Sequence, residues 1–285
     1  MTDDHVYLAL TEEHEGTDAR WAFGTGFEDP LHGVDTGVPA GLDAAALAAA
    51  CTALGDDALI SAQRLAEWCT NAPELEDEVA LANIGLDLLG QARLLYTRAG
   101  QVDGSGRGED DFAYLREANE FRNLRLAELP NGDFAFSVAR LLVFSTWRLA
   151  LFTQLAASSP DPVLSAIAAK AVKETTYHLR YAADWTVRLG DGTELSARKM
   201  GAAMEQVAAY LDEMCEAGAM LAVDAAALRE AVIAQLRHVC DVATLAYPTP
   251  TQDPLRGRDG EHTEYLAPLV EELQSLARSL PGAVW

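Results

Sequence analysis

Positively charged residues are scarce in this 285-residue sequence, which has 21 Lys and Arg against 44 Asp and Glu and a net charge of −23. An acidic surface repels the phosphate backbone of nucleic acids. It is also repelled by the anionic lipids of a membrane leaflet. We therefore expect neither nucleic acids nor membranes among the partners of this protein.

Cysteines are also few, and no C-x-x-C pair occurs among Cys51, Cys69, Cys215 and Cys240. Their spacing argues against a zinc site, and their number does not suggest a disulfide scaffold. The first residues lack the basic and apolar regions of a signal peptide, and no uninterrupted apolar run reaches about 18 residues. Together these absences predict a cytoplasmic protein.

Glu-x-x-His pairs, which some helical bundles use to hold two iron ions, are absent as well. The residue three positions before each of the six histidines is Thr, Asp or Gln. Glu and His at this spacing would share one helix face and could reach the same metal ion. Nucleotide-binding loops and the G-x-S-x-G motif of serine hydrolases are also missing.

The first 42 residues are acidic and rich in Gly and Pro, a composition that argues against helix. Residues 1–50 hold ten acidic residues and a single base, Arg20. Trp21, Phe23 and Phe27 also lie here, and aromatic residues are unusual in a free tail. We predict that residues 1–42 form an N-terminal extension that docks as a strap on the remainder.

From Asp43 onward, strong helix formers dominate and apolar residues recur at steps of three and four. In 75–95 this periodic set includes Leu75, Val79, Leu81, Leu86, Leu88, Leu89 and Leu95. Asp133 and Ser196 fit N-caps, Pro160 and Pro162 fit first turns, and Gly100 and Gly190 fit C-caps. The predicted helices lie near 43–54, 56–70, 74–99, 110–128, 133–157, 161–189, 194–217, 224–246 and 261–279.

Long antiparallel helices joined by short loops predict an all-α bundle, with residues 43–285 as one domain and extra helices at its C-terminal end. Polar residues stand inside several of these helices, notably Gln63, Asp87, Glu174 and His178. They fit a metal cluster with altered ligands or a buried hydrogen-bond network. We favour the network, because only His178 could offer a nitrogen ligand.

Two further groups of residues have alternative interpretations. Arg116, Arg122 and Arg125 fall within one predicted helix and fit an anion-binding patch or, as we favour, a mixed solvated face. A second group is expected in the core or at a subunit interface rather than around a cofactor: Phe144, Trp147, Leu151 and Phe152.

Three ordered segments carry a specific resemblance to a known family. They are NIGLDLLGQARLL (83–95), LPNGDFA (129–135) and the stretch from YHLR (177–180) to RLGDGTE (188–194). From about residue 51 to the C-terminus, the sequence resembles the non-catalytic, ferritin-like structural subunit of ring-1,2-phenylacetyl-CoA epoxidases, also called phenylacetate-CoA oxygenases. The resemblance implies a ferritin-like bundle and a structural role in aerobic phenylacetate catabolism.

The resemblance also implies a division of labour within a multicomponent monooxygenase. A homologous catalytic subunit would carry the di-iron centre, and a reductase with flavin and an iron–sulfur cluster would supply electrons from NADPH. The present chain would hold no cofactor and be inactive alone. Gln63, Asp87 and Glu174 stand roughly where carboxylate ligands are expected, whereas Gly90 and Tyr177 stand where histidines would be needed. We therefore expect no catalytic, cofactor-binding or metal-binding residue.

Two alternatives are kept. The chain could be an active oxygenase with atypical ligands such as Asp87, Glu174 and His178, or a stand-alone helical module for binding or iron storage. The oxygenase and the iron-storage module would both need carboxylate and imidazole groups that face one another. In isolation we expect a homodimer.

Overall fold

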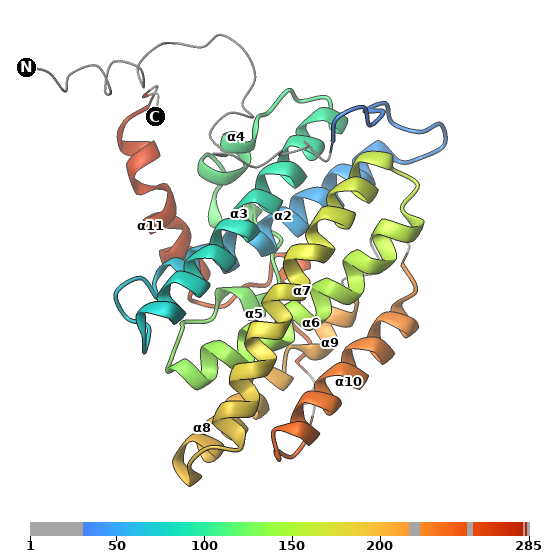
Figure 1. The fold of residues 1–285 in the computed structure, drawn as a ribbon. Helices are drawn as coiled ribbons and strands as arrows, with labels where there is room; N and C mark the ends of the chain where they lie inside the picture. The colour runs from blue at the N-terminus through green and yellow to red at the C-terminus, as the bar shows by residue number, and fades with distance from the viewer. Residues whose placement is uncertain (1–30, 217–222, 250–252, 282, 284–285) are drawn as a thin grey trace, which may run out of the picture. The chain divides into compact units, whose positions relative to one another are not determined.

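The computed structural model describes residues 31–216, 223–249, 253–281 and 283. The chain divides into two compact units, residues 1–33 and 34–285. Within its described residues the second unit contains only helices and irregular segments, and no strand (Figure 1). Trp21, Phe23 and Phe27 lie outside the described residues, so the strap stays a prediction.

Four long helices form the centre of the second unit. They are α2 (Ala44–Ala66), α3 (Leu75–Val102), α6 (Phe134–Ser158) and α7 (Pro162–Gly190). Consecutive helices pair as two hairpins, α2 with α3 and α6 with α7, and α3 packs against α7 to join the hairpins (Figure 1). This arrangement confirms the predicted ferritin-like bundle.

Shorter helices surround this bundle. The structure places α8 (Glu194–Ala208) and α10 (Ala225–Val242) against α6. Helix α9 (Leu211–Glu216) packs against both α6 and α10, and the C-terminal α11 (Leu266–Ser279) covers the segment after α3. The peripheral helices therefore extend the core of the bundle on two sides.

The helix ends largely follow local side-chain chemistry. Asp133 caps α6 by accepting a hydrogen bond from the amide of Phe136, and Pro162 begins α7, as predicted. Ser196 is wrong as an N-cap: Thr193 is the cap of α8, and Ser196 closes the reciprocal capping box from inside the first turn.

Gly100 is also wrong as a C-cap, because α3 continues to Val102. A Cβ atom at Gly100 would lie 2.0 Å from the carbonyl oxygen of Arg107. The glycine therefore allows the loop after α3 to fold back against the helix. Its role is close packing rather than helix termination.

The structure joins one pair of predicted helices and divides two others. The break expected at Gly55 does not occur, since α2 runs unbroken from Ala44 to Ala66. The helix expected over 110–128 is divided into α4 (Glu109–Tyr114), η1 (Ala118–Glu120) and α5 (Arg125–Glu128). The helix expected over 194–217 is divided into α8 and α9. Long-range contacts, described below, hold the 121–124 backbone extended.

Helices α2 and α6 are long and apolar enough to cross a membrane by length and composition alone. However, 67% and 78% of their apolar windows are buried inside the protein. Core helices of soluble proteins have the same properties, so these two helices are weak evidence for a membrane span. Phe144, Trp147, Leu151 and Phe152 of α6 are all buried in this core.

Candidate functional site

Polar side chains run along the seam where α3 and α7 pack antiparallel. Four contacts at successive levels join the two helices: Asp77 with Tyr181 and Trp185, Asp87 with His178, Gln91 with Glu174, and Arg98 with Asp161. A ferritin-like site would be built from facing helices at this depth. The seam is therefore the place to test for metal binding.

Asp87 and His178 form a direct pair across the seam. The Oδ2 atom of Asp87 lies 3.0 Å from Nε2 of His178. The imidazole is buried, whereas the carboxylate side chain is 39% exposed. The structure thus brings together two of the four residues singled out from the sequence, as partners of each other.

The next level down the seam is a connected hydrogen-bond network. Gln91 donates from Nε2 to Oε2 of Glu174 (2.9 Å) and accepts at Oε1 from Nε of Arg148 (2.8 Å). Lys170, one turn before Glu174, forms an ion pair with its other carboxylate oxygen. Both functional groups of Gln91 and the carboxylate of Glu174 are thereby engaged.

Arg148 brings a guanidinium group from α6 into this network and is fully buried. It lies 3.4 Å from the carbonyl oxygen of Leu54 on α2, and its Cζ atom lies 4.4 Å from the ring centre of Phe152. Burial lowers the pKa of Arg148 to about 10, which leaves the group protonated at neutral pH. The bundle centre therefore contains a fixed positive charge.

This donor set does not fit a di-iron site. Among the described residues, no three His, Cys, Asp or Glu side chains converge. Arg148 and Lys170 place positive charge around Glu174, and like charge disfavours a bound cation. Gln63 is half-buried on α2 and has no hydrogen-bond partner among the described residues, while Tyr177 is exposed. The described residues of the bundle centre therefore provide no ligand set for a metal-dependent step.

The sequence did not single out Arg148. Its position in an apolar helix could have marked it, because an arginine rarely stands among residues such as Phe144, Trp147 and Leu151 without a buried partner. The position of Gln91 between Glu174 and Arg148 depends on how three helices pack. Spacing along one helix carries no information on that arrangement.

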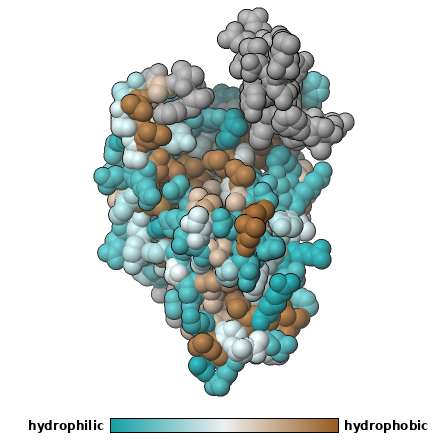
Figure 2. Space-filling model, turned by 60° about the vertical axis from the view of Figure 1, so that its left-hand side comes forward, coloured by the Kyte–Doolittle hydropathy of each residue, from teal (hydrophilic) through white to brown (hydrophobic). Residues whose placement is uncertain are grey.

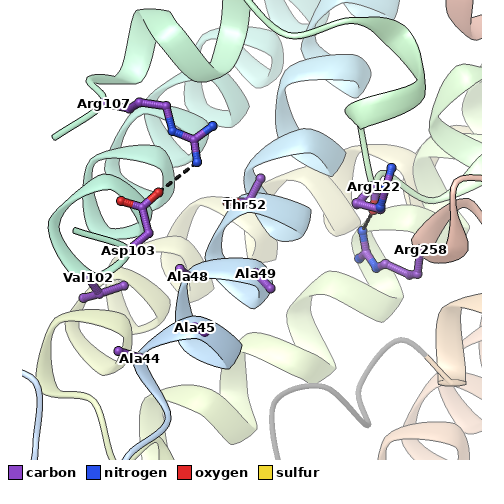
Figure 3. A pocket seen from close by; sticks show the side chains of 10 residues that line it. All are labelled: Ala44, Ala45, Ala48, Ala49, Thr52, Val102, Asp103, Arg107, Arg122 and Arg258. Atoms are coloured by element: carbon purple, nitrogen blue, oxygen red, sulfur yellow. Dashed lines mark hydrogen bonds and ion pairs between the residues drawn. The ribbon is translucent and has the colours of Figure 1, made fainter. Parts of the chain in front are cut away.

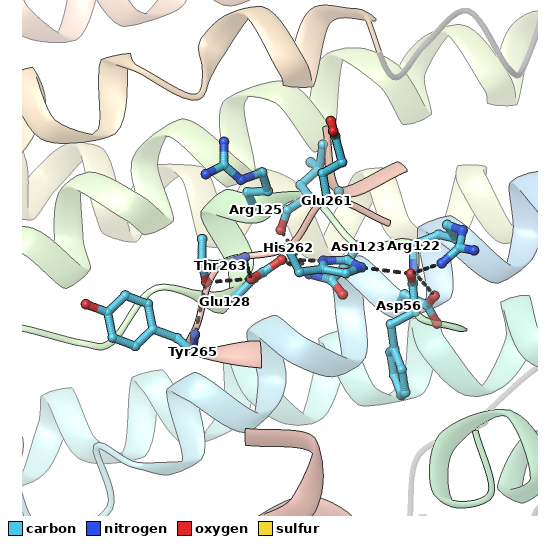
Figure 4. Close-up of polar contacts among 12 residues, drawn as sticks. Asp56, Arg122, Asn123, Arg125, Glu128, Glu261, His262, Thr263 and Tyr265 are labelled. Carbon is cyan, nitrogen blue, oxygen red and sulfur yellow. Dashed lines mark hydrogen bonds and ion pairs between the residues drawn. The ribbon is translucent and has the colours of Figure 1, made fainter. Parts of the chain in front are cut away.

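Arg116, Arg122 and Arg125 do not form the solvated helix face that we favoured. They lie in the irregular region around η1 and α5, and Arg116 and Arg125 are buried. Arg116 binds the buried carboxylate of Asp56, which also accepts from the backbone amide of Arg122 at 2.8 Å (Figure 4). Buried charges are normally paired in this way.

A neighbouring buried carboxylate, Asp57, has the same function. It accepts from the amide of Leu124 (2.7 Å) and pairs with Arg258 (2.5 Å). Glu128 similarly holds the C-terminal segment, through His262 Nδ1 (2.6 Å) and the amide of Thr263 (2.7 Å) (Figure 4). These contacts replace helical hydrogen bonds, which explains why the predicted 110–128 helix is divided.

An open cavity of about 530 Å³ lies over the N-terminal half of α2 (Figure 3). Its lining consists of Ala44, Ala45, Ala48, Ala49, Thr52, Val102, Asp103, Arg107, Arg122 and Arg258. Arg107 pairs with Asp103, and Arg258 pairs with Asp57. The lining offers no paired nucleophile and base, so the cavity has no catalytic arrangement.

Sequence comparisons with known proteins identify the family to which this helical bundle is similar. The profile of a family described as "Phenylacetic acid catabolic protein" matches residues 38–285. The chain is also 45% identical over 240 residues to a protein of Escherichia coli (strain K12) that is named as the C subunit of 1,2-phenylacetyl-CoA epoxidase. That alignment covers 81% of the present chain and 96% of the E. coli protein.

Proposed function

Because this chain belongs to the family of phenylacetic acid catabolic proteins, we propose that it is the structural, non-catalytic subunit of a multicomponent phenylacetyl-CoA epoxidase. In this proposal a homologous catalytic subunit holds the di-iron centre and the substrate. A reductase with flavin and an iron–sulfur cluster delivers electrons from NADPH in the cytoplasm. The present chain supports the catalytic subunit and carries no cofactor.

The observation that carries this proposal is the set of charged and polar side chains at the centre of the bundle. The Arg148 guanidinium, held by Gln91 and Leu54, supplies a positive charge where a metal site would need converging carboxylates. Glu174 is neutralised by Lys170 and bonded to Gln91. A bundle with this interior is suited to rigid packing rather than to oxygen chemistry.

The net charge supports the same division of labour. Coenzyme A is a polyanion, and a chain with a net charge of −23 repels it. A more basic partner is the better host for the acyl-CoA substrate. Such a partner would also be attracted to the acidic chain, which favours association of the two subunits.

One contact favours a second candidate, an oxygenase with atypical ligands. Asp87 and His178 lie 3.0 Å apart and offer a carboxylate and an imidazole. To bind a metal ion they would have to give up their direct hydrogen bond, and Glu174 would have to leave Lys170 and Gln91. The second candidate therefore requires rearrangement of three contacts that the first candidate keeps.

Metal analysis and activity measurements distinguish the two candidates. The purified chain should contain substoichiometric iron and show no oxygen-dependent turnover. Together with the catalytic subunit and the reductase, it should increase phenylacetyl-CoA-dependent NADPH oxidation. Stoichiometric iron, with turnover by this chain alone that Asp87→Asn and His178→Gln abolish, would favour the second candidate instead. Size-exclusion chromatography of the same preparation tests the expected homodimer.

A further inference from the structure

The outer face of α3 carries large apolar side chains that nothing in the described structure covers. Leu75 is 70% exposed, Leu86 is 64% exposed, and Val79 and Leu89 are exposed as well. The face of α3 that points into the bundle has its own apolar residues, among them Leu81, Leu88 and Leu95. A helix that is apolar on both sides is normally buried on both sides.

The four exposed residues form one stripe rather than a scatter. At about 100° per residue, Leu75, Val79, Leu86 and Leu89 fall within an arc of about 80° on the side opposite the core. They extend over about 21 Å of helix at 1.5 Å per residue. Ala82 lies on the same arc, and its small side chain would let another helix approach closely.

Surface apolar residues occur elsewhere, but not as a continuous helical stripe. Figure 2 shows separate apolar patches among hydrophilic side chains on one side of the molecule. Outside α3 and α11, no described helix carries more than one of the large exposed apolar residues. Isolated residues of this kind need no explanation, whereas a contiguous stripe marks an interaction site.

The charged residues around the stripe indicate which kind of partner binds this face of α3. Glu74, Glu76 and Glu78 stand at the first turn of α3, and none of them has an ion-pair partner among the described residues. At the other end Arg93 is already neutralised by Glu109 at 2.8 Å. The surface is therefore apolar along its length and negatively charged at one end.

A second copy of this chain is a poor occupant for such a surface. A second copy carries the same acidic first turn, and the Arg93 at the other end of its stripe is already paired with Glu109, so its α3 offers no unpaired cation for this face. The fitting partner has an apolar helix face with Lys or Arg residues positioned against the first turn of α3. Long helices suitable for such a face are present in a homologous bundle subunit.

We infer that the outer face of α3, formed by Leu75, Val79, Leu86 and Leu89, is the docking surface for the homologous catalytic subunit. This inference rests on the proposed function and adds the surface through which the two subunits associate. Leu86 is 64% exposed and has an apolar neighbour of the stripe on each side, Val79 and Leu89, so a charge placed there disrupts contacts in both directions. The acidic first turn of α3 steers the more basic partner and determines its orientation.

The test compares two leucines that are similarly exposed on helices. Leu86→Glu places a charge in the stripe, and Leu195→Glu places one on α8, where Leu195 is 56% exposed. Both variants should keep the helical circular dichroism and melting temperature of the wild type. Binding of each to the purified catalytic subunit of the same organism is then measured by biolayer interferometry and size-exclusion chromatography.

The expected result is an increase in Kd of about tenfold or more for Leu86→Glu and of less than about twofold for Leu195→Glu. Amide hydrogen exchange in 75–90 should slow when the wild type binds the catalytic subunit. Equal effects of the two variants, or no protection of 75–90, would overturn the inference and leave the proposed function intact.

Two other outcomes identify different failures. If Leu86→Glu dissociates a homodimer of this chain but leaves the complex with the catalytic subunit unchanged, the occupant is a second copy and the inference is wrong. If the wild type forms no complex with the catalytic subunit at all, the proposed function fails together with the inference.

Discussion

Arg148 places a buried positive charge at the centre of the bundle. Transfer of a guanidinium from water to an apolar core is unfavourable unless its donors are paired. Here Nε donates to Gln91, both Nη atoms lie near the Leu54 carbonyl oxygen, and Phe152 stacks on the group. These contacts compensate for burial and join α2, α3 and α6.

Replacement of Arg148 by Met tests this account. The substitution leaves Oε1 of the buried Gln91 without its donor, so we expect the free energy of unfolding to fall by about 1–3 kcal/mol. Urea denaturation followed by circular dichroism measures the change. Arg180→Met is the control, since Arg180 makes only an exposed 4.0 Å pair with Asp184 and should cost less than about 0.5 kcal/mol. Equal losses would contradict a special role for Arg148.

Glu213 on α9 is a buried carboxyl group that accepts hydrogen bonds from the amides of Gly257 (2.8 Å) and Arg125 (3.2 Å). Burial raises its pKa from the ordinary value of 4.5 to about 7, although the amide hydrogen bonds oppose the shift. The folded protein therefore binds this proton more tightly than the unfolded chain does. Its contribution to stability is present below pH 4.5 and is lost as the pH rises to about 7.

Glu213→Gln should remove this part of the pH dependence. Between pH 4.5 and 7 the wild type should lose up to about 3 kcal/mol relative to the variant, because the variant has no proton to release. Urea denaturation of both proteins at several pH values measures the difference. The pKa of His262 is also raised, because its hydrogen bond to Glu128 outweighs the effect of burial, so its contribution to stability is likewise lost as the pH rises. His262 is present in both proteins, so its contribution cancels when the wild type is compared with the variant. Parallel pH curves would contradict the prediction.

At the scale of the element, α2 shows how packing overrides a local signal. Gly55 lies in the middle of the helix, where glycine is normally unfavourable relative to alanine. A Cβ atom at this position would lie 2.6 Å from Cε1 of Tyr96. The glycine is therefore required by the Tyr96 ring on α3, whose hydroxyl donates to Asp56 at 2.7 Å.

Gly55→Ala should accordingly destabilise the protein by about 1–3 kcal/mol, because the Tyr96 ring would have to move. The matched control is Gly201→Ala on α8, where a Cβ atom would meet no atom within 4 Å. That substitution should stabilise by about 0.5–1 kcal/mol through helix propensity. Thermal unfolding followed by circular dichroism gives both values, and equal signs would contradict the packing argument.

At the scale of the whole molecule, the charge of −23 opposes the folded state through self-repulsion. Low concentrations of NaCl should therefore raise Tm, because salt screens charges on the surface but acts little on buried pairs such as Asp56–Arg116. The double substitution Glu271→Lys and Glu272→Lys on exposed positions of α11 changes the net charge from −23 to −19. Its Tm should rise less steeply between about 20 and about 200 mM NaCl.

Differential scanning calorimetry at several salt concentrations measures both slopes. A Tm that falls with salt in the wild type would mean that attractive surface pairs outweigh the net charge. The double variant also tests whether the effect depends on total charge rather than on one acidic cluster, since its substitutions lie on α11 and leave the first turn of α3 unchanged.

The sequence by itself determined the class of fold and the family. Helix propensity, apolar periodicity and caps such as Asp133 act over a few residues, so they can be recognised in the sequence without a structure. The lack of Glu-x-x-His is also a local fact, and it led to the expectation of a chain without metal ligands. Gly55 and the 110–128 segment were misjudged, because distant residues control them.

Tertiary structure alone decided which side chains meet. The periodic apolar residues of 75–95 looked equivalent in the sequence, yet Leu88 lies in the core and Leu86 lies on the surface. Arg116 looked solvated but is buried against Asp56, and Arg148 on α6 has hydrogen-bond partners on α2 and α3. The physical reason is that burial and pairing depend on neighbours from other helices, whereas residue spacing specifies only which residues share a face of one helix.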